Sequence, residues 1–282
     1  MSLAPIETEP EGLYLELLAG CLTRTLLGYG YEPAIPPRQP YERAVFSLVK
    51  RGFGARGIEL MRRVNLDPNI RAEGRDWPRE GETMIGLTRL RNLRDCIADV
   101  IRRGVPGDLI EAGVWRGGAT IYMRAALKAY GDTQRVVWVA DSFQGLPPPD
   151  PVRYPDDAGD RHWEWSEVLG VSQAEVEANF RRYGLLDDRV RFLPGWFQDT
   201  LPDAPIDRLA ILRLDGDMYE STKVALDALY PKLSPGGYVI VDDYKNPNLT
   251  GCKTAVDDYR AEHGIGEPTQ DIDWTAVYWR RR

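Results

Sequence analysis

The feature that most constrains the fold of this chain is an alternation of short apolar runs with amphipathic segments that begins at Thr83. Largely apolar runs, such as "RVVWVAD" (135–141), are separated by stretches in which apolar residues recur at helical spacings. Strands that alternate with helices are typical of a parallel sheet covered on both faces. We therefore predict an α/β fold, with a mostly parallel twisted sheet, helices on both faces and an antiparallel strand near the C-terminus.

The predicted strands and helices follow one another from residue 84 to residue 281. The strands are expected at 107–114, 135–141, 189–195, 208–215, 236–243 and 274–281, and the helices at 84–103, 117–130, 173–184, 220–233 and 253–264. In sheets of this kind, ligands lie beyond the carboxyl ends of the strands. The residues that end these strands are therefore the first candidates for a functional site.

The first 80 residues lack this alternation. Residues 13–27 predict a helix from the spacing of their leucines, and residues 41–63 predict a second helix interrupted by glycines. Between them, "GYGYEPAIPPRQP" (28–40) is rich in glycine and proline and predicts no regular structure. We interpret residues 1–80 as an N-terminal helical extension of a single domain, used for substrate or subunit contacts, and residues 81–282 as its catalytic part.

The turn after the first predicted strand, "EAGVWRGGAT" (111–120), is rich in glycine. A dinucleotide-binding turn needs Gly-x-Gly-x-x-Gly, and Trp115 stands where the middle glycine would let a pyrophosphate approach the backbone. A P-loop is excluded because its Gly-Lys-Ser/Thr is missing. The next strand ends in Asp141, 28 residues beyond Gly113, and an acid there can accept both hydroxyls of a ribose. These features favour a ribose-containing cofactor without a pyrophosphate; a helix-entry turn and a solvated acid are the alternative.

Four aspartates end two successive strands. Asp215 and Asp217 follow "LAILRL", and Asp242 and Asp243 follow "GGYVIV". Like charges that are brought together repel, and burial strengthens the repulsion. A cation that prefers hard oxygen ligands, such as Mg²⁺, would neutralise them. The alternatives are solvated turn residues and, for Asp217, a cap on the helix predicted from residue 220.

The composition argues against several classes of function. A net charge of −7 without a long basic tract is unsuited to nucleic acid, and no apolar run approaches the roughly 20 residues of a membrane helix. Two histidines argue against a zinc site. Three widely spaced cysteines are typical of a reducing compartment, and the N-terminus has no pattern of a signal peptide. We therefore expect a cytoplasmic protein that binds neither nucleic acid nor membrane.

Six longer motifs resemble one family of enzymes. They are "ETMIGLTRLRNLRD", "GDLIEAGVWRGGATIYMRAAL", "VADSFQGLP", "GWFQDTLP", "LRLDGDMYEST" and "VDDY". Together they resemble the macrocin O-methyltransferase family, from about Tyr14 to the C-terminus. The resemblance implies a Rossmann-like class I methyltransferase fold, S-adenosylmethionine and Mg²⁺ as cofactors, and antibiotic tailoring at a sugar hydroxyl of a glycosylated small molecule. Members of the family form homo-oligomers, so we expect a homodimer.

The resemblance also implies roles for individual residues. Asp215, Asp242 and Asp243 match the metal ligands. Asp217 would be the base that accepts the hydroxyl proton, and His162, in the proline-rich loop at 142–170, is the competing base. The residues expected around S-adenosylmethionine lie in the glycine-rich turn, before it, and at strand ends: Thr83, Met84, Glu111, Ala112, Gly113, Val114, Trp115, Thr120, Asp141, Ser142, Trp196, Phe197 and Asp215.

Two other functions stay open at the level of sequence. A Mg²⁺-dependent O-methyltransferase of catechol-like phenols would use the same cation site, because a diol meets the metal in both reactions. A cofactor-binding protein without catalysis is the other alternative. The four aspartates count against it, since such a protein has no need of uncompensated acids.

Overall fold

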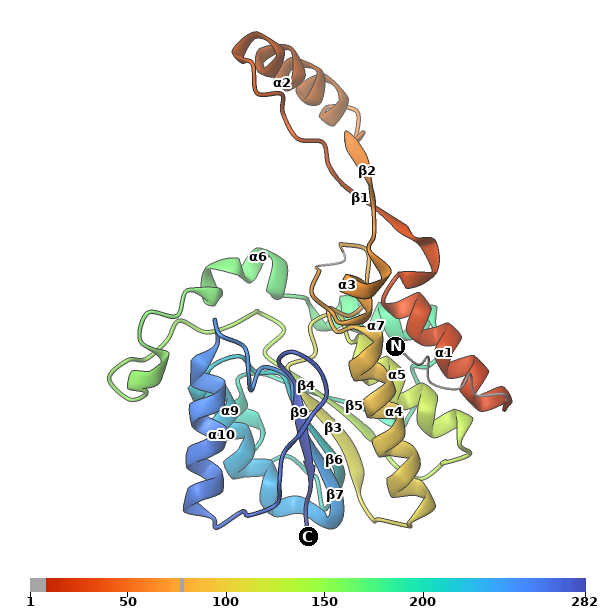
Figure 1. Cartoon of the computed structure of the whole chain (residues 1–282), viewed down its shortest axis with the longest axis vertical. Helices are drawn as coiled ribbons and strands as arrows, with labels where there is room; N and C mark the ends of the chain where they lie inside the picture. The colour runs from red at the N-terminus through yellow and green to blue at the C-terminus, as the bar shows by residue number, and fades with distance from the viewer. Residues whose placement is uncertain (1–8, 77–78) are drawn as a thin grey trace.

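The centre of the molecule is a seven-stranded sheet, seen in a computed structural model that describes residues 9–76 and 79–282 (Figure 1). The strand order is β5-β4-β3-β6-β7-β9-β8. The first five of these strands are parallel, and β9 runs antiparallel to both β7 and β8. The predicted fold is thus confirmed. The strands are β3 Asp108–Ala112, β4 Val137–Asp141, β5 Val190–Pro194, β6 Leu209–Leu214, β7 Leu233–Val241, β8 Gln270–Asp271 and β9 Val277–Arg280.

The order of the strands reverses between β3 and β6. Chain order runs from β3 through β4 to β5 in one direction and from β6 to β7 in the other. A crevice opens beyond the carboxyl ends of the strands at such a reversal, which is where ligands of open α/β sheets bind. The topology therefore places the glycine-rich turn, Asp141 and both aspartate pairs at one edge.

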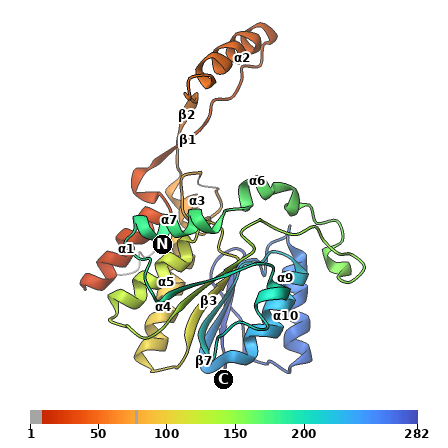
Figure 2. The same cartoon turned by 180° about the vertical axis from the view of Figure 1, so that it is seen from behind.

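The two faces of the sheet are covered by different helices (Figures 1 and 2). Along β4, Val137 and Val139 pack into one apolar cluster, and Trp138 and Ala140 into the other, as the alternation of side chains on a strand requires. Helices α4 Leu87–Arg102, α5 Gly118–Ala129 and α7 Gln173–Arg182 contribute to the first cluster, and α9 Tyr219–Leu229 and α10 Thr250–Glu262 to the second. Burial on both faces explains why the strands are apolar throughout.

Helix α1, Pro10–Leu22, belongs to the same core. It begins with a proline, which suits the first helical position because a backbone N–H there would have no partner within the helix. Its side chains Leu15, Leu18 and Leu22 are buried in the apolar cluster to which α4 and α5 also contribute. The helix ends earlier than predicted, and Thr25–Leu27 forms a short 3₁₀ turn. The division of the chain at residue 80 stays a prediction.

The prediction for the rest of the extension is wrong in two places. Helix α2 ends at Gly54 rather than at residue 63, and β2, Met61–Asn65, pairs antiparallel with β1, Tyr29–Pro33. The sequence predicts a helix over the first three residues of β2, and no regular structure for β1. Strand pairing depends on a distant partner, so local periodicity does not reveal it. Residues 28–66 form an arm that projects from the body and carries α2, Pro40–Gly54, at its tip (Figures 1 and 2).

Residues 142–170, which we call the lid segment, contain short helical turns. These are the 3₁₀ turns Pro155–Asp157 and His162–Trp165 and the helix α6, Ser166–Leu169. The remaining short elements are α3 Pro68–Ala72, α8 Phe197–Thr200 and the 3₁₀ turn Tyr230–Lys232. Within the described ranges, the helices are too short or too polar to cross a membrane.

Candidate active site

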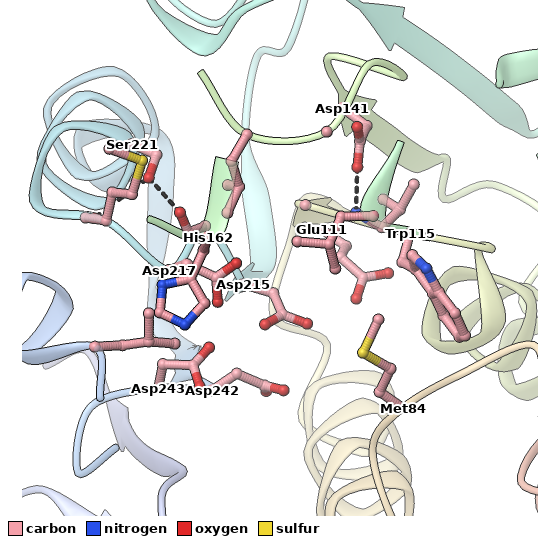
Figure 3. A pocket seen from close by; sticks show the side chains of 18 of the residues that line it. Met84, Glu111, Trp115, Asp141, His162, Asp215, Asp217, Ser221, Asp242 and Asp243 are labelled. Atoms are coloured by element: carbon pink, nitrogen blue, oxygen red, sulfur yellow. Dashed lines mark hydrogen bonds between the residues drawn. The ribbon is translucent and has the colours of Figure 1, made fainter. Parts of the chain in front are cut away.

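A cavity of about 480 Å³ lies beyond the carboxyl ends of the parallel strands. Figure 3 shows its two sides: Glu111, Trp115 and Asp141 lie on one, Asp217 and Asp243 on the other, and Asp215 between them. The first side is formed by β3, β4 and the glycine-rich turn, and the second by the ends of β6 and β7. One cavity therefore joins the predicted cofactor turn to the predicted cation site.

The glycine-rich turn requires glycine at Gly113 for two reasons. Its φ is +90°, a conformation that other residues rarely adopt, and an added Cβ would lie 1.9 Å from the carbonyl oxygen of Asp215. The ends of β3 and β6 can approach each other closely only because this side chain is absent. The turn also places Trp115 at a positive φ of 48°. Its indole Nε1 donates a hydrogen bond of 2.9 Å to the carbonyl of Val168 in the lid segment.

Asp141 holds the turn in place. Its Oδ2 accepts a hydrogen bond from the backbone N–H of Val114 at 2.8 Å, and its Oδ1 accepts one from Phe143 at 2.7 Å. Burial raises the pKa of Asp141, although these backbone hydrogen bonds oppose the shift. The Ser142 hydroxyl lies 3.5 Å from Oδ1 as a further, weak donor, and the Trp115 N–H also favours the charged form of this carboxyl.

The structure places most of the predicted cofactor residues at the cavity, but two of them lie outside it. Ala112 is buried in the sheet, where its carbonyl accepts from the N–H of Asp215, and the Thr120 hydroxyl donates to the carbonyl of Gly117 inside α5. Neither side chain faces the cavity. The predicted residues that line it are Thr83, Met84, Glu111, Gly113, Val114, Trp115, Asp141, Ser142, Trp196, Phe197 and Asp215.

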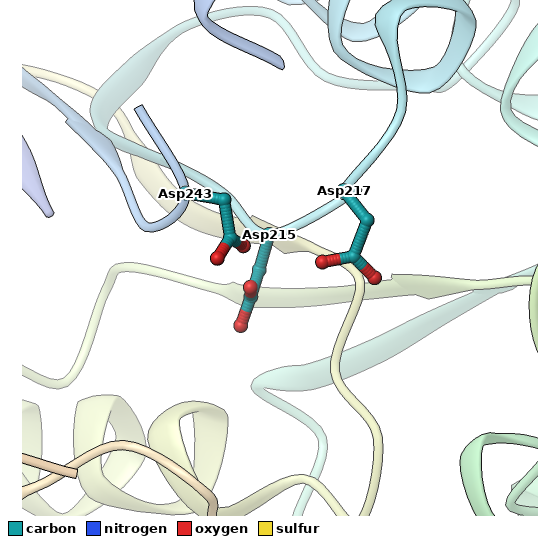
Figure 4. Close-up of side chains that lie close together, drawn as sticks. All are labelled: Asp215, Asp217 and Asp243. Carbon is teal, nitrogen blue, oxygen red and sulfur yellow. The ribbon is translucent and has the colours of Figure 1, made fainter. Parts of the chain in front are cut away.

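Three carboxylates lie together at the ends of β6 and β7. Asp215, Asp217 and Asp243 each offer an oxygen within 4.8 Å of the others, an arrangement suited to a metal ion (Figure 4). This group differs from the predicted ligand set, because it contains Asp217 in place of Asp242.

Asp242 is held by two arginines. Its Oδ2 forms ion pairs with Arg89 Nη1 at 2.6 Å and with Arg213 Nη2 at 2.5 Å, and the side chain is only 1% exposed. Its other oxygen, Oδ1, is buried and has no hydrogen-bond partner among the described residues. Arg213 also pairs with Glu111 and with Asp215, so one guanidinium joins β3, β6 and β7 beneath the cavity. A buried carboxylate oxygen without a partner is costly, and Asp242 also lines the cavity, so a cation there would satisfy it.

Burial and mutual repulsion raise the pKa of several carboxyls at the site. The pKa of Asp215 lies well above its ordinary value because of burial and the charge of Asp242, against which Arg213 acts. Burial, then Asp243 and Asp215, raises the pKa of Asp217 in the same way. Burial also raises the pKa of Glu111 to about 7, although Arg213 opposes this shift. The arrangement thus carries excess negative charge that a divalent cation would stabilise.

Asp217 does not cap the helix that follows it, so the alternative interpretation of this residue is wrong. The residue has a φ of +63°, and α9 begins after the N-cap Met218, which makes no side-chain cap. Asp157 of the lid segment caps this helix instead, since it accepts hydrogen bonds from the backbone N–H groups of Tyr219 and Glu220. Asp217 is left facing the cavity.

His162 lies in the lid segment and lines the same cavity. Its Nδ1 is 3.1 Å from Oδ1 of Asp160, so the carboxylate of Asp160 lies beside one of the two ring nitrogens. Both candidate bases, Asp217 and His162, therefore lie at the cavity.

The residues that support the site are not among the predicted ones. Arg213 carried a usable signal, because an arginine inside an apolar strand must meet buried acids. Arg89 and Asp157 carried none, since each meets its partner across a long separation in the chain.

Comparison with known proteins identifies the family. Residues 11–281 match the family of macrocin-O-methyltransferases (TylF). The chain belongs to this family. The predicted resemblance is confirmed. A rhamnosyl-tetracenomycin-C 4'-O-methyltransferase of Streptomyces olivaceus is 56% identical over 214 residues, which cover 76% of this chain and 81% of the relative. A demethyldecarbamoylnovobiocin O-methyltransferase of Streptomyces niveus is 57% identical over 215 residues, which cover 75% and 80%.

Solved structures agree with this assignment. The O-methyltransferase NovP is 46% identical and superposes with a TM-score of 0.77, covering 96% of this chain and 99% of NovP. The calicheamicin methyltransferase CalS11 is 19% identical with a TM-score of 0.57, covering 99% and 98%, and shows a shared fold. The chain is therefore an O-methyltransferase by family, and it shares the fold of these enzymes.

Proposed function

We propose that the chain transfers the methyl group of S-adenosylmethionine to a sugar hydroxyl of a glycosylated natural product in antibiotic tailoring. The observation that carries the proposal is the single cavity, in which the Gly113 turn and Asp141 face three clustered aspartates. The substrate named for the Streptomyces olivaceus relative carries a rhamnosyl group, and this name supports a sugar hydroxyl as the acceptor.

The cofactor would occupy the side of the cavity formed by β3 and β4. Asp141 would accept the ribose hydroxyls, Met84 and Thr83 would contact the methionine end, and Trp196 and Phe197 would flank the adenine. Isothermal titration tests this directly: S-adenosylmethionine and its demethylated product should each bind at micromolar concentrations. Absence of binding by both would refute the cofactor assignment.

The cation would be Mg²⁺, held by Asp215, Asp242 and Asp243. The clustered oxygens of Asp215 and Asp243 support this set, as does Oδ1 of Asp242, which has no partner in the described part of the chain. Carboxylate oxygens are the ligands that Mg²⁺ prefers. When bound, the cation would lower the pKa of the acceptor hydroxyl and hold its orientation. Asp217, the third member of the cluster, is the competing ligand.

Asp217 would act as the base. The hydroxyl oxygen forms a bond to the methyl carbon as the carbon–sulfur bond breaks, and the hydroxyl proton passes to the carboxylate of Asp217. A carboxylate is a weak base, so this role requires a hydroxyl that is already acidified. His162, on the lid segment, is the alternative proton acceptor.

Three variants separate these roles. Asp217→Asn should lose most of kcat and keep its affinity for Mg²⁺, whereas Asp242→Asn should lose Mg²⁺ affinity, both measured by titration of the cation and by steady-state turnover. Loss of Mg²⁺ affinity in Asp217→Asn would make it a ligand. If His162→Ala lost most of kcat while Asp217→Asn kept it, the histidine would be the base.

The acceptor class is tested with paired substrates. A glycosylated aglycone with a free sugar diol should be methylated, whereas a simple catechol should not. Methylation of the catechol alone would overturn the sugar assignment in favour of a phenol methyltransferase.

We also propose that the protein acts as a homodimer in the cytoplasm. The exposed apolar face of α2, on the projecting arm, supports a contact between subunits. The three cysteines are free thiols, which supports a reducing compartment.

A further inference from the structure

Two hydrogen-bonded attachments of the lid segment to the body of the protein matter here. At its C-terminal end, the carbonyl of Val168 accepts the hydrogen bond from the indole of Trp115 in the cofactor turn. In its middle, Asp157 reaches the start of α9, where its Oδ1 is 2.6 Å from the backbone nitrogen of Tyr219 and its Oδ2 is 2.9 Å from that of Glu220. His162 lies between these two attachments.

The attachment at Asp157 is enclosed on several sides. Asp157 is only 3% exposed, although its neighbours on both sides in the lid segment are exposed. Gly251, at the start of α10, leaves the space for it, because a Cβ there would lie 2.8 Å from Oδ1 of Asp157. The Tyr154 ring packs against Tyr219 with centroids 6.0 Å apart. A buried acid on an otherwise exposed loop thus has a site shaped to hold it.

The helix that Asp157 caps, α9, begins directly after the turn that carries Asp217. The first N–H groups of a helix have no partner within the helix, and Met218 at the N-cap position supplies none. Asp217 precedes it with a φ of +63°, a left-handed conformation that an aspartate adopts only at some cost. The two hydrogen bonds to Asp157 therefore hold the residues that follow Asp217 in the orientation that directs its carboxylate into the cavity.

We propose that Asp157 is a positioning residue, which couples closure of the lid segment to the placement of the Asp217 carboxylate. When the lid segment is down, Asp157 orders the start of α9 and with it the turn that carries Asp217. When the lid segment lifts, the helix loses its cap and the turn relaxes. The site is then assembled only when the loop that bears His162 also covers the cavity. This inference rests on the proposed function, because it assigns a role within that reaction.

Three variants test the proposal by turnover. Asp157→Ala removes both hydrogen bonds and should lower kcat by roughly 100-fold, the loss expected when a reacting group is displaced by about 1 Å. The KM and the dissociation constant for S-adenosylmethionine should stay within about twofold, because Asp157 bonds to Tyr219 and Glu220, whereas Asp141 holds the cofactor turn. Asp157→Asn keeps one acceptor oxygen and should recover most of the lost kcat. Asp150→Ala is the matched control: Asp150 is exposed, lies in the same segment, and makes similar hydrogen bonds to the backbone of Val152 and Arg153.

A second measurement does not depend on turnover. Arg153 and Arg161 are trypsin sites on either side of Asp157. Cleavage at these two residues should become at least tenfold faster in Asp157→Ala, should change much less in Asp157→Asn, which keeps one of the two hydrogen bonds, and should stay unchanged in Asp150→Ala. If the wild-type protein turned over no acceptor, the proposed function would fail while this result still reported the attachment.

Either of two results would overturn the proposal. One is an Asp157→Ala variant that keeps the wild-type kcat although its lid segment is cleaved faster. The other is a variant whose kcat, cofactor affinity and melting temperature all fall together without recovery in Asp157→Asn, which would make Asp157 a residue of general stability.

Discussion

At the scale of single residues, two arginines decide how the acids at the strand ends are arranged. Arg213 stands inside the apolar strand β6 and meets Glu111, Asp215 and Asp242, and Arg89 meets Asp242 from α4. The sequence shows four aspartates at strand ends, but it does not show which of them is already paired with an arginine. That distinction depends on a helix more than 150 positions away from Asp242, and it makes the partnerless Oδ1 of Asp242 a stronger indication of a metal than the acids alone.

Loss of Arg213 should therefore be severe. Arg213→Met leaves the buried carboxylates of Glu111 and Asp242 without this cation, and breaking a buried pair in this way costs about 3–5 kcal/mol. Arg208→Met, five positions earlier and exposed, should cost at most about 1 kcal/mol. The free energy of unfolding in urea measures both. Equal stability of the two variants would show that the network beneath the cavity contributes little.

At the scale of elements, the parallel sheet was predictable and the arm was not. Strands buried on both faces are apolar throughout, and the helices between them show their own period, so β3 to β7 lie close to their predicted positions. The strands β1 and β2 are stabilised by pairing with each other, although α2 separates them in the sequence, and both are largely exposed. Neither burial nor alternation marks them in the sequence.

The close approach of β3 and β6 can be tested at Gly113. Gly113→Ala combines a positive φ with a Cβ 1.9 Å from the carbonyl oxygen of Asp215, whereas Gly131→Ala has a positive φ of 73° and open space around it. The alanine at 113 should lose at least about 2 kcal/mol more stability than the alanine at 131, and should bind S-adenosylmethionine more weakly. Thermal unfolding and cofactor titration measure these effects. Similar losses in both variants would argue that backbone conformation alone matters at Gly113.

The turn between α5 and β4 should give stability that depends on pH. Burial acts to raise the pKa of Asp132, but hydrogen bonds from the backbone N–H groups of Arg135 and Gln134 and from the Arg135 side chain outweigh it, so the net pKa is lowered. A carboxyl whose pKa is lower in the folded state stabilises the protein above its unfolded pKa and loses this effect as pH falls through the folded value.

Asp132→Asn should accordingly be less stable than the wild type at pH 7. The difference should shrink once the pH falls below about 4, near the ordinary pKa of an aspartate. Urea unfolding of both proteins across this range provides the comparison. A difference that stayed constant with pH would mean that the charge of Asp132 is not what stabilises the turn.

At the scale of the whole molecule, the arm is the part that the core does not explain. None of the residues of α2 is buried, and one face of this helix carries exposed apolar side chains. Residues 28–66 contain seven basic and three acidic side chains, a net charge of +4, whereas the whole chain carries −7. The remainder therefore carries −11, so the arm is complementary in charge to the body of a second copy. The exposed apolar residues of the helix are Tyr41, Val45, Leu48, Val49 and Phe53.

A dimer formed through this helix should be sensitive to Leu48, which is 73% exposed within one chain. Leu48→Asp should shift the molar mass measured by light scattering from that of a dimer to that of a monomer, because it would bury a charge in the interface. Val152→Asp, at an exposed position of the lid segment, should leave the mass unchanged. A dimer that survives Leu48→Asp would place the contact elsewhere.

We propose that the aspartates at the ends of β6 and β7 bind a divalent cation on which methyl transfer depends. The most direct measurement is methyl transfer from S-adenosylmethionine to a glycosylated acceptor with a free sugar diol, before and after EDTA. We predict that EDTA abolishes turnover without releasing the cofactor, and that Mg²⁺ restores turnover in the wild type but not in Asp215→Asn. Turnover that persists in EDTA at its full rate would contradict the account.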